Sequence, residues 1–264
     1  MEARRSPAEI RRIRKQRALA ALVLVLFLAA WWGLVWVRDM SPLVLPSPLR
    51  VWNNLVVNLI NGHLLVHLWV TLQEIVLGFL AGSALGVGLG TAVAHSQMVL
   101  RVLNPYIIAS QAMPKLALAP IFVLWFGFGI FPKVVIAGLI VFFPLLENTI
   151  TGLNEVDPEK VELFRSLDAT RWQIFLKLRL PNAVPFIFTG LRVAVVLSVV
   201  GAVVGEYVGA NRGLGALIIA SQGTMDTPLM FSVFVVLTAL GYALYKLMSS
   251  LERICLKWRY LDQE

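Results

Sequence analysis

Several long stretches of the sequence contain no charged residue, and these constrain the fold more than any other feature. Residues 18–37 are one such stretch, with the length that an α-helix needs to cross the roughly 30 Å hydrocarbon core of a bilayer. Across the 264 residues, 58% are hydrophobic and only 14% are charged. This composition excludes a disordered chain, a disulfide scaffold and most soluble enzymes. The sequence therefore predicts an all-α integral membrane protein.

About six transmembrane helices fit the chain. A membrane domain over residues 18–250 is preceded by a basic N-terminal segment, 1–17, and followed by a C-terminal tail, 251–264. The first span ends in three tryptophans, Trp31, Trp32 and Trp36, which favours a retained, interface-anchored helix over a cleaved signal peptide. The expected spans are 18–37, 69–94, 104–126, 132–150, 183–209 and 229–250, with a long loop over 151–182.

Basic residues are distributed unevenly between the two sides that this topology defines. The net charge is +8. The N-terminal segment carries Arg4, Arg5, Arg11, Arg12, Arg14, Lys15 and Arg17. Only four basic residues fall in the proposed outer segments, namely Arg38, Arg50, Lys133 and Arg212. The positive-inside rule then places both termini in the cytoplasm, with the N-terminal cluster contacting anionic lipid rather than nucleic acid.

Two further features shape the spans. Gly78, Gly82, Gly86 and Gly90 recur every four residues on one helical face, a pattern typical of closely packed membrane helices. Residues 104–126 are interrupted by prolines, so we expect a broken helix that faces protein or a cavity rather than lipid. Between the first two spans, an amphipathic helix begins after Ser47, with Trp52 and Leu55 on its apolar face.

Ionisable residues within spans are candidates for a functional role. Lys115 and Glu206 lie nearest the interior of their spans, where a charge is costly and usually functional. Structural pairing, for example of Lys115 with Glu206, is the alternative. Trp125 and Phe126 are candidates for an apolar gate or for ordinary packing. Glu74, Glu147 and Arg192 are expected near span ends, either snorkelling or paired internally. The lone Cys255 and the pair His63 and His67 do not provide a metal site.

The loop 151–182 carries two helix-start signals. Asp157-Pro158 caps a first short helix, and Thr170 with Gln173 forms a capping box for a second. We expect Pro181 to end the second helix. Together they predict a compact helical knuckle, residues 157–182, whose exposed apolar face suits docking to another protein.

At this loop the sequence resembles a known family. The segment Glu162-Leu-Phe-Arg-Ser-Leu-Asp168, then nine residues, then Leu178-Arg-Leu-Pro181, resembles the EAA loop of binding-protein-dependent ABC importer permeases. Leu163 and Phe164 replace the alanines of that pattern, and Asp168 replaces its glycine. Asp tolerates the left-handed conformation of that turn. Further motifs resemble the nitrate, sulfonate and taurine branch: Leu45-Pro-Ser-Pro48, Leu124-Trp-Phe-Gly127, Thr189-Gly-Leu-Arg192 and Gly213-Leu-Gly215.

The resemblance implies the transmembrane subunit of an importer in the bacterial inner membrane. It implies a permease homodimer, two cytoplasmic ATP-binding subunits, and an external solute-binding protein that delivers nitrate, a sulfonate, taurine or a pyrimidine precursor. The chain contains no phosphate-binding GxxxxGK[ST] loop, so ATP and Mg²⁺ would bind the partner and this chain would hold no cofactor and have no enzymatic activity. Its coupling residues would be Glu162, Leu163, Phe164, Leu167, Asp168 and Pro181.

Two other functions remain in view. An ion-coupled secondary transporter would carry its own coupling site and internal repeats, and no convincing repeat relates the two halves. A membrane enzyme would need a catalytic motif, and neither HExxH nor GxSxG appears.

Overall fold

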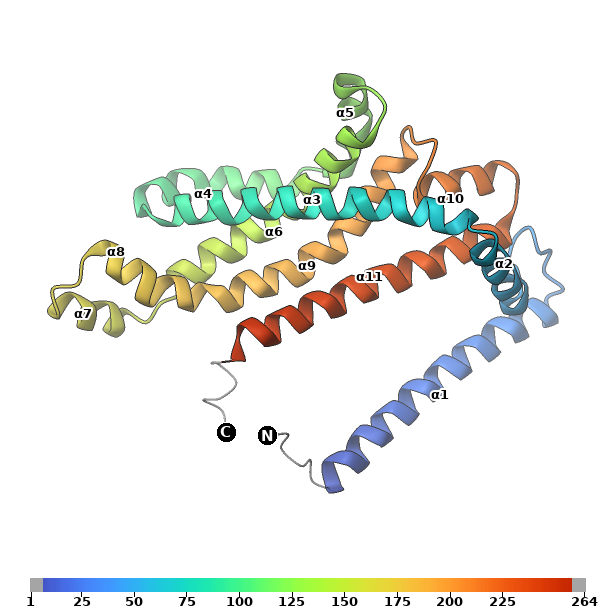
Figure 1. Ribbon diagram of the computed structural model, residues 1–264, viewed down its shortest axis with the longest axis horizontal. Coiled ribbons are helices and arrows are strands. Elements are labelled where there is room, and N and C mark those ends of the chain that lie inside the picture. Colours follow the sequence, from blue (N-terminus) through green and yellow to red (C-terminus); the bar gives the residue numbers. More distant parts are fainter. Residues whose placement is uncertain (1–6, 258–264) are drawn as a thin grey trace.

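The structure, a computed structural model, describes residues 7–257, and in that part of the chain it contains helices and no strands. The predicted segments 1–17 and 251–264 therefore lie partly outside the described residues. Five helices are long, and Figure 1 shows four of them, α3, α6, α9 and α11, gathered into one bundle. These long helices are α1 (Pro7–Val37), α3 (His63–Ala94), α6 (Ile130–Asn154), α9 (Leu180–Tyr207) and α11 (Thr227–Cys255).

Shorter elements connect them. They are α2 (Pro48–Ile60), α4 (Gln97–Ala112), η1 (Lys115–Leu118), α5 (Ala119–Phe126), α7 (Pro158–Ser166), α8 (Arg171–Ile174), η2 (Phe175–Arg179) and α10 (Leu214–Gly223). Five of the described helices are long and apolar enough to cross a membrane, or six if α4 and the helix after it form one bent span. The prediction of an all-α protein with about six transmembrane helices is confirmed.

The predicted span 104–126 is not one straight helix. It consists of two segments, Gln97–Ala112 and Lys115–Phe126, bent by 78°. Met113 adopts an extended conformation, with ψ 131°, because the following Pro114 disfavours the helical region for its predecessor. Pro105 lies within α4 without breaking it, and Pro120 falls in the first turn of α5, where a missing N–H costs little.

The centre of the bundle is a close contact of α3 with α6, which in turn packs on α9. The four-residue glycine series of α3 faces α6, as its spacing predicts. A Cβ added at Gly86 would lie 2.7 Å from the carbonyl oxygen of Phe142. A Cβ at Gly90 would lie 2.8 Å from the Cβ of Thr149. Only glycine lets the two backbones approach this closely.

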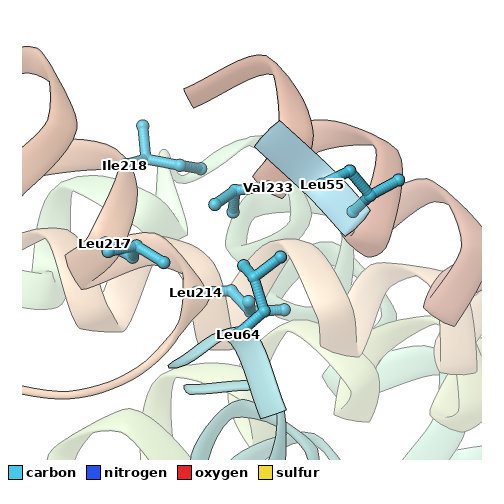
Figure 2. Packing of buried hydrophobic residues seen from close by; sticks show 6 residues of the cluster. All are labelled: Leu55, Leu64, Leu214, Leu217, Ile218 and Val233. Atoms are coloured by element: carbon cyan, nitrogen blue, oxygen red, sulfur yellow. The ribbon is translucent and has the colours of Figure 1, made fainter. Parts of the chain in front are cut away.

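A second core joins α2, α10 and α11 at one end of the bundle. Figure 2 shows six buried residues from α2, α3, α10 and α11 pointing toward one another. On α2 the buried residues are Val51 and Leu55, whereas Trp52 is 61% exposed. Leu55 of the predicted apolar face is therefore buried and Leu59 packs against the same cluster, whereas Trp52 lies outside it. The cluster consists of Leu55, Leu64, Leu214, Leu217, Ile218 and Val233.

Helix α1 stands apart from the bundle (Figure 1). The apolar part of this helix, Arg14–Val37, is unburied within the chain. Its contact with the bundle includes Trp31, whose ring centroid lies 5.6 Å from that of Phe231 on α11. Such an apolar surface requires lipid or another membrane helix around it.

The glycine seam between α3 and α6 gives a direct prediction. Gly82→Leu or Gly86→Leu should sharply reduce the yield of folded protein, because a side chain there forces the helices apart and loses packing on both. Gly88→Leu is the matched control, since a Cβ at Gly88 meets nothing within 4 Å. Fluorescence-detected size exclusion in mild detergent measures the yields. Equal monodisperse yields for the three variants would contradict this packing.

Candidate functional site

The predicted knuckle is present and is built by local capping. The Asp157 carboxylate accepts a hydrogen bond from the Glu159 N–H at 3.0 Å, at the start of α7. The Thr170 hydroxyl and the Gln173 side chain form the complete capping box of α8. Between the two helices Asp168 adopts the left-handed conformation, with φ 54°, and the Ala169 N–H donates to the Phe164 carbonyl at 3.0 Å. The turn therefore forms with Asp168 at the position of the glycine in the EAA pattern, as expected.

The expectation that Pro181 ends the second helix is wrong. Residues 171–207 form one continuous helical stretch from the knuckle into the bundle. A π-helical turn, η2, immediately precedes α9, in whose first turn Pro181 lies. The wider turn changes the hydrogen-bonding register where proline has no N–H to donate. The knuckle is thus joined directly to the span α9.

The knuckle presents an apolar face. Leu163 on α7 is 57% exposed, and Leu167, directly after α7, is 71% exposed. Glu162 is exposed next to Leu163 in the sequence, whereas Phe164 is half-buried. Glu162, Leu163 and Leu167 are therefore the exposed members of the predicted coupling set on and directly after α7, whereas Phe164 and Pro181 are half-buried.

Three of the four pathway candidates, Lys115, Trp125 and Phe126, lie in the bent pair of helical segments 97–112 and 115–126. The Lys115 ammonium donates to the Gln111 carbonyl at 3.1 Å and lies 4.6 Å from the ring centroid of Phe143. Trp125 is 68% exposed on α5, and the Phe126 ring lies edge-on to it. Figure 1 shows α5 projecting from the bundle. Glu206 is far along the chain from them and is buried at the end of α9.

The expected pairing of Lys115 with Glu206 is wrong, because each has other partners. The Glu206 carboxylate accepts from the Thr71 hydroxyl at 2.6 Å and from the Gly215 backbone N–H. The Leu214 N–H donates to the Thr71 hydroxyl at 2.7 Å. Of the first N–H groups of α10, one thus donates to the Glu206 carboxylate and one to the Thr71 hydroxyl that itself donates to this carboxylate, an arrangement that helix N-termini favour. Gly213, with φ 127°, leaves the room that Glu206 occupies.

A buried ion pair adjoins this carboxylate. The Lys133 ammonium on α6 lies 2.6 Å from a carboxylate oxygen of Glu74 on α3. Glu74 is one helical turn from Thr71, on the same face. We expected Lys133 in an outer loop and Glu74 near a span end. Both side chains are almost fully buried, since the charges neutralise each other inside the seam between α3 and α6.

An open hollow of about 470 Å³ lies beside the pair. It is formed by α3, the turn before α6 and the loop after α9, with Glu74 and Lys133 in its wall. Sequence reasoning missed Lys133, although a lysine and two glutamates inside otherwise apolar segments are the signal for mutual pairing. Elsewhere Arg192 pairs with Glu252 at 3.0 Å, which confirms the expected internal pairing of this arginine, and Glu147 is exposed.

Comparison with known proteins gives a consistent picture. Residues 82–255 match the model of the family described as "binding-protein-dependent transport system inner membrane component". The formylaminopyrimidine transport permease protein ThiX of Halalkalibacterium halodurans is 37% identical over 246 residues, which cover 93% of this chain and 98% of the relative. The riboflavin transport system permease protein RibX of Chloroflexus aurantiacus is 37% identical, with coverage of 90% and 88%.

A solved structure shares the fold. The inward-facing MetNI methionine ABC transporter contains a chain that superposes with a TM-score of 0.63 over 72% of this chain and 95% of that one, at 21% identity. At this identity the match supports the helical arrangement alone.

The buried pair should be important for stability. Lys133→Met leaves Glu74 buried without a counter-charge and should destabilise the protein by about 3–5 kcal/mol. Lys133→Met combined with Glu74→Leu removes both charges and should restore much of the loss. Lys115→Met is the control, because that ammonium pairs only with a carbonyl and a ring and should change stability little. Thermal unfolding in detergent measures all three. Wild-type stability of Lys133→Met alone would contradict the pairing.

Proposed function

The chain belongs to the family of binding-protein-dependent transport system inner membrane components, and we propose that its knuckle couples a partner ATPase to a path for a small heterocyclic solute. Membership makes the chain a multi-pass permease subunit of an ABC importer, with ATP hydrolysis in separate subunits and a binding protein as partner. Energy released in a separate ATPase reaches the membrane helices only through a part of the permease that touches both.

The knuckle is the observation that supports the coupling role. Its outer face combines exposed leucines, Leu163 and Leu167, with the exposed carboxylate of Glu162. An exposed apolar patch beside a charge is typical of a protein interface. Because residues 171–207 are continuously helical, a displacement of the knuckle moves α9 with it. Asp168 fixes the turn, and Phe164 and Pro181 are half-buried, so in this proposal these residues act by positioning the knuckle.

We assign the ATP and Mg²⁺ sites to the partner ATPase and none to this chain. Two copies of the permease would each present one knuckle to one of two ATPase subunits. ATP-driven closure of the ATPases would then alternate the paired permeases between outward and inward openings. In this topology the knuckle and both termini face the cytoplasm of a bacterial inner membrane, and the Glu206 cluster lies toward the outer side, where the binding protein docks.

The path itself is proposed to form between two copies, lined by the bent pair α4–α5. This pair carries large exposed apolar side chains, among them Leu124 at 81% and Trp125 at 68%, which a second copy would cover. Broken membrane helices generally face protein or a cavity. In this arrangement Trp125 and Phe126 form an apolar gate, and Lys115, held beside Phe143, contributes a positive charge near the bend. Glu206 acts from outside the path by fixing α10.

The proposed cargo is a small planar heterocycle of the pyrimidine-precursor type. Two relatives at 37% identity are named for formylaminopyrimidine and riboflavin transport. Aromatic rings in the last part of α5 suit such a solute, because Phe122, Trp125 and Phe126 form a continuous set of ring contacts on which a planar ring can stack. A sulfonate or taurine is the second candidate, favoured by the Lys115 charge.

A reconstituted importer tests the assignment. The permease, its ATPase and its binding protein are placed in proteoliposomes, and the binding protein is first screened by thermal shift against pyrimidines, flavins, sulfonates and nitrate. We expect ATP-dependent uptake of the heterocycle that stabilises the binding protein. Uptake driven by an ion gradient without ATP would instead identify a secondary transporter.

Glu162→Lys should uncouple the importer while leaving the bundle folded. A like charge facing a basic ATPase surface costs enough to weaken docking, and we expect solute-stimulated ATP hydrolysis to fall about ten-fold. Glu155→Lys is the control, an exposed charge reversal at the end of α6, outside the docking face. Hydrolysis is measured in the proteoliposomes with binding protein and solute. Full stimulation of Glu162→Lys would remove this residue from the coupling role.

A further inference from the structure

A pocket separates the knuckle from the end of the bundle. It has a volume of about 480 Å³ and is bordered by the end of α3, the start of α4 and the bundle side of the knuckle. Figure 1 shows α7 and α8 at this end of the molecule, beside the turn from α3 to α4. Its floor is apolar, formed by Ala94, Leu153 and Ile174. This pocket lies on the side of α7 opposite the exposed leucines and is distinct from the docking face.

The polar wall of the pocket is basic. Arg165 on α7, Arg171 on α8 and Arg179 on η2 line it together with His95 at the end of α3. Among its described lining residues none is acidic. The salt bridges within residues 7–257 join Lys133 to Glu74 and Arg192 to Glu252, so within this part of the chain the three arginines have no carboxylate partner. Three guanidinium groups around one pocket repel one another unless an anion lies between them.

The neighbouring side chains hold the pocket in shape without neutralising it. The Gln97 side chain donates to the Asn154 side chain at 3.0 Å, which ties the start of α4 to the end of α6. The His95 ring lies edge-on to Phe175, with centroids 6.5 Å apart. Thr91 donates back to the Val87 carbonyl at 2.8 Å. None of these contacts, all within the described residues, places a negative charge in the basic wall.

We propose that the pocket lined by Arg165, Arg171, Arg179 and His95 binds a phosphate group, which joins the knuckle to the α3–α4 turn. Guanidinium groups bind phosphate oxygens in a bidentate manner, and several around one anion give a strong site. Given the cytoplasmic topology proposed above, the pocket lies at the inner membrane surface, where basic pockets between helices bind anionic lipid headgroups. The phosphate therefore comes either from such a lipid or from a soluble phosphate compound.

The bound anion has a mechanical consequence. Arg165, Arg171 and Arg179 belong to the knuckle, whereas His95 directly follows α3, which is fixed to α6 by the glycine seam. An anion shared between them makes the knuckle and the bundle move as one body. Loss of the anion loosens this link, so coupling of ATP hydrolysis to transport depends on the anion even though the docking face is intact.

The test uses the permease–ATPase complex in nanodiscs. Variants Arg171→Gln and Arg179→Gln, singly and together, are compared with the wild type, and Lys177→Gln is the control because Lys177 is exposed on η2 but does not line the pocket. Native mass spectrometry measures retained phosphatidylglycerol, and isothermal titration measures inorganic phosphate binding in phosphatidylcholine discs. Size exclusion confirms that every variant is assembled.

We expect each substitution to weaken retention of the phosphate-bearing probe about ten-fold, with Lys177→Gln unchanged. Retention of phosphatidylglycerol without binding of inorganic phosphate identifies a lipid site, and the reverse identifies a soluble anion. Equal binding of both probes by the wild type and the double variant overturns the proposal. Absence of both ligands from the wild-type complex overturns it as well. Both measurements report anion binding and neither measures solute uptake. A failure of this proposal is therefore distinguishable from a failure of the transport assignment.

Discussion

The close approach of α3 to α6 is the contact on which the rest of the structure depends. Lipid tails are as apolar as the side chains they surround, so helices in a membrane associate by close packing and polar pairing rather than by the hydrophobic effect. Here Gly86 and Gly90 provide the packing, and Lys133 with Glu74 provides the polar pair. A glycine also allows α9 to pack closely on α6, since a Cβ at Gly205 would lie 3.1 Å from Lys133. The result is a rigid core of three helices.

This core connects two chemically different ends. The knuckle continues directly into α9 and, at the other end of α9, the Glu206 carboxylate accepts a hydrogen bond from the Gly215 N–H in the first turn of α10. Helix α6 runs in the same way from Lys133 to Asn154 beside the knuckle pocket. A movement imposed at the knuckle is therefore carried along stiff helices rather than dissipated in loops. This is the property that a permease driven by an external ATPase requires.

The features that follow from local chemistry could be predicted from the sequence, and those that depend on distant partners could not. The knuckle could be predicted because its helix caps are local. The side chains of Thr170 and Gln173, three residues apart, each accept a hydrogen bond from the other's backbone N–H. The burial of Lys133 was missed because a lysine near the start of a span also fits a loop, and its partner Glu74 lies far from it in sequence. The prediction that Pro181 ends a helix failed for a related reason, since a π-helical turn lets the helix continue through a residue that ordinarily ends it.

Coupling through the outer face of the knuckle is the central claim, and site-specific photocrosslinking tests it most directly. A benzophenone amino acid replaces Leu167, 71% exposed on that face, in the complex with its ATPase. The same probe at Leu24, exposed on α1, is the control. We predict a permease–ATPase adduct from position 167 whose yield changes when ATP binds, and none from position 24. Absence of an adduct at 167 in a complex that still hydrolyses ATP would contradict this coupling role.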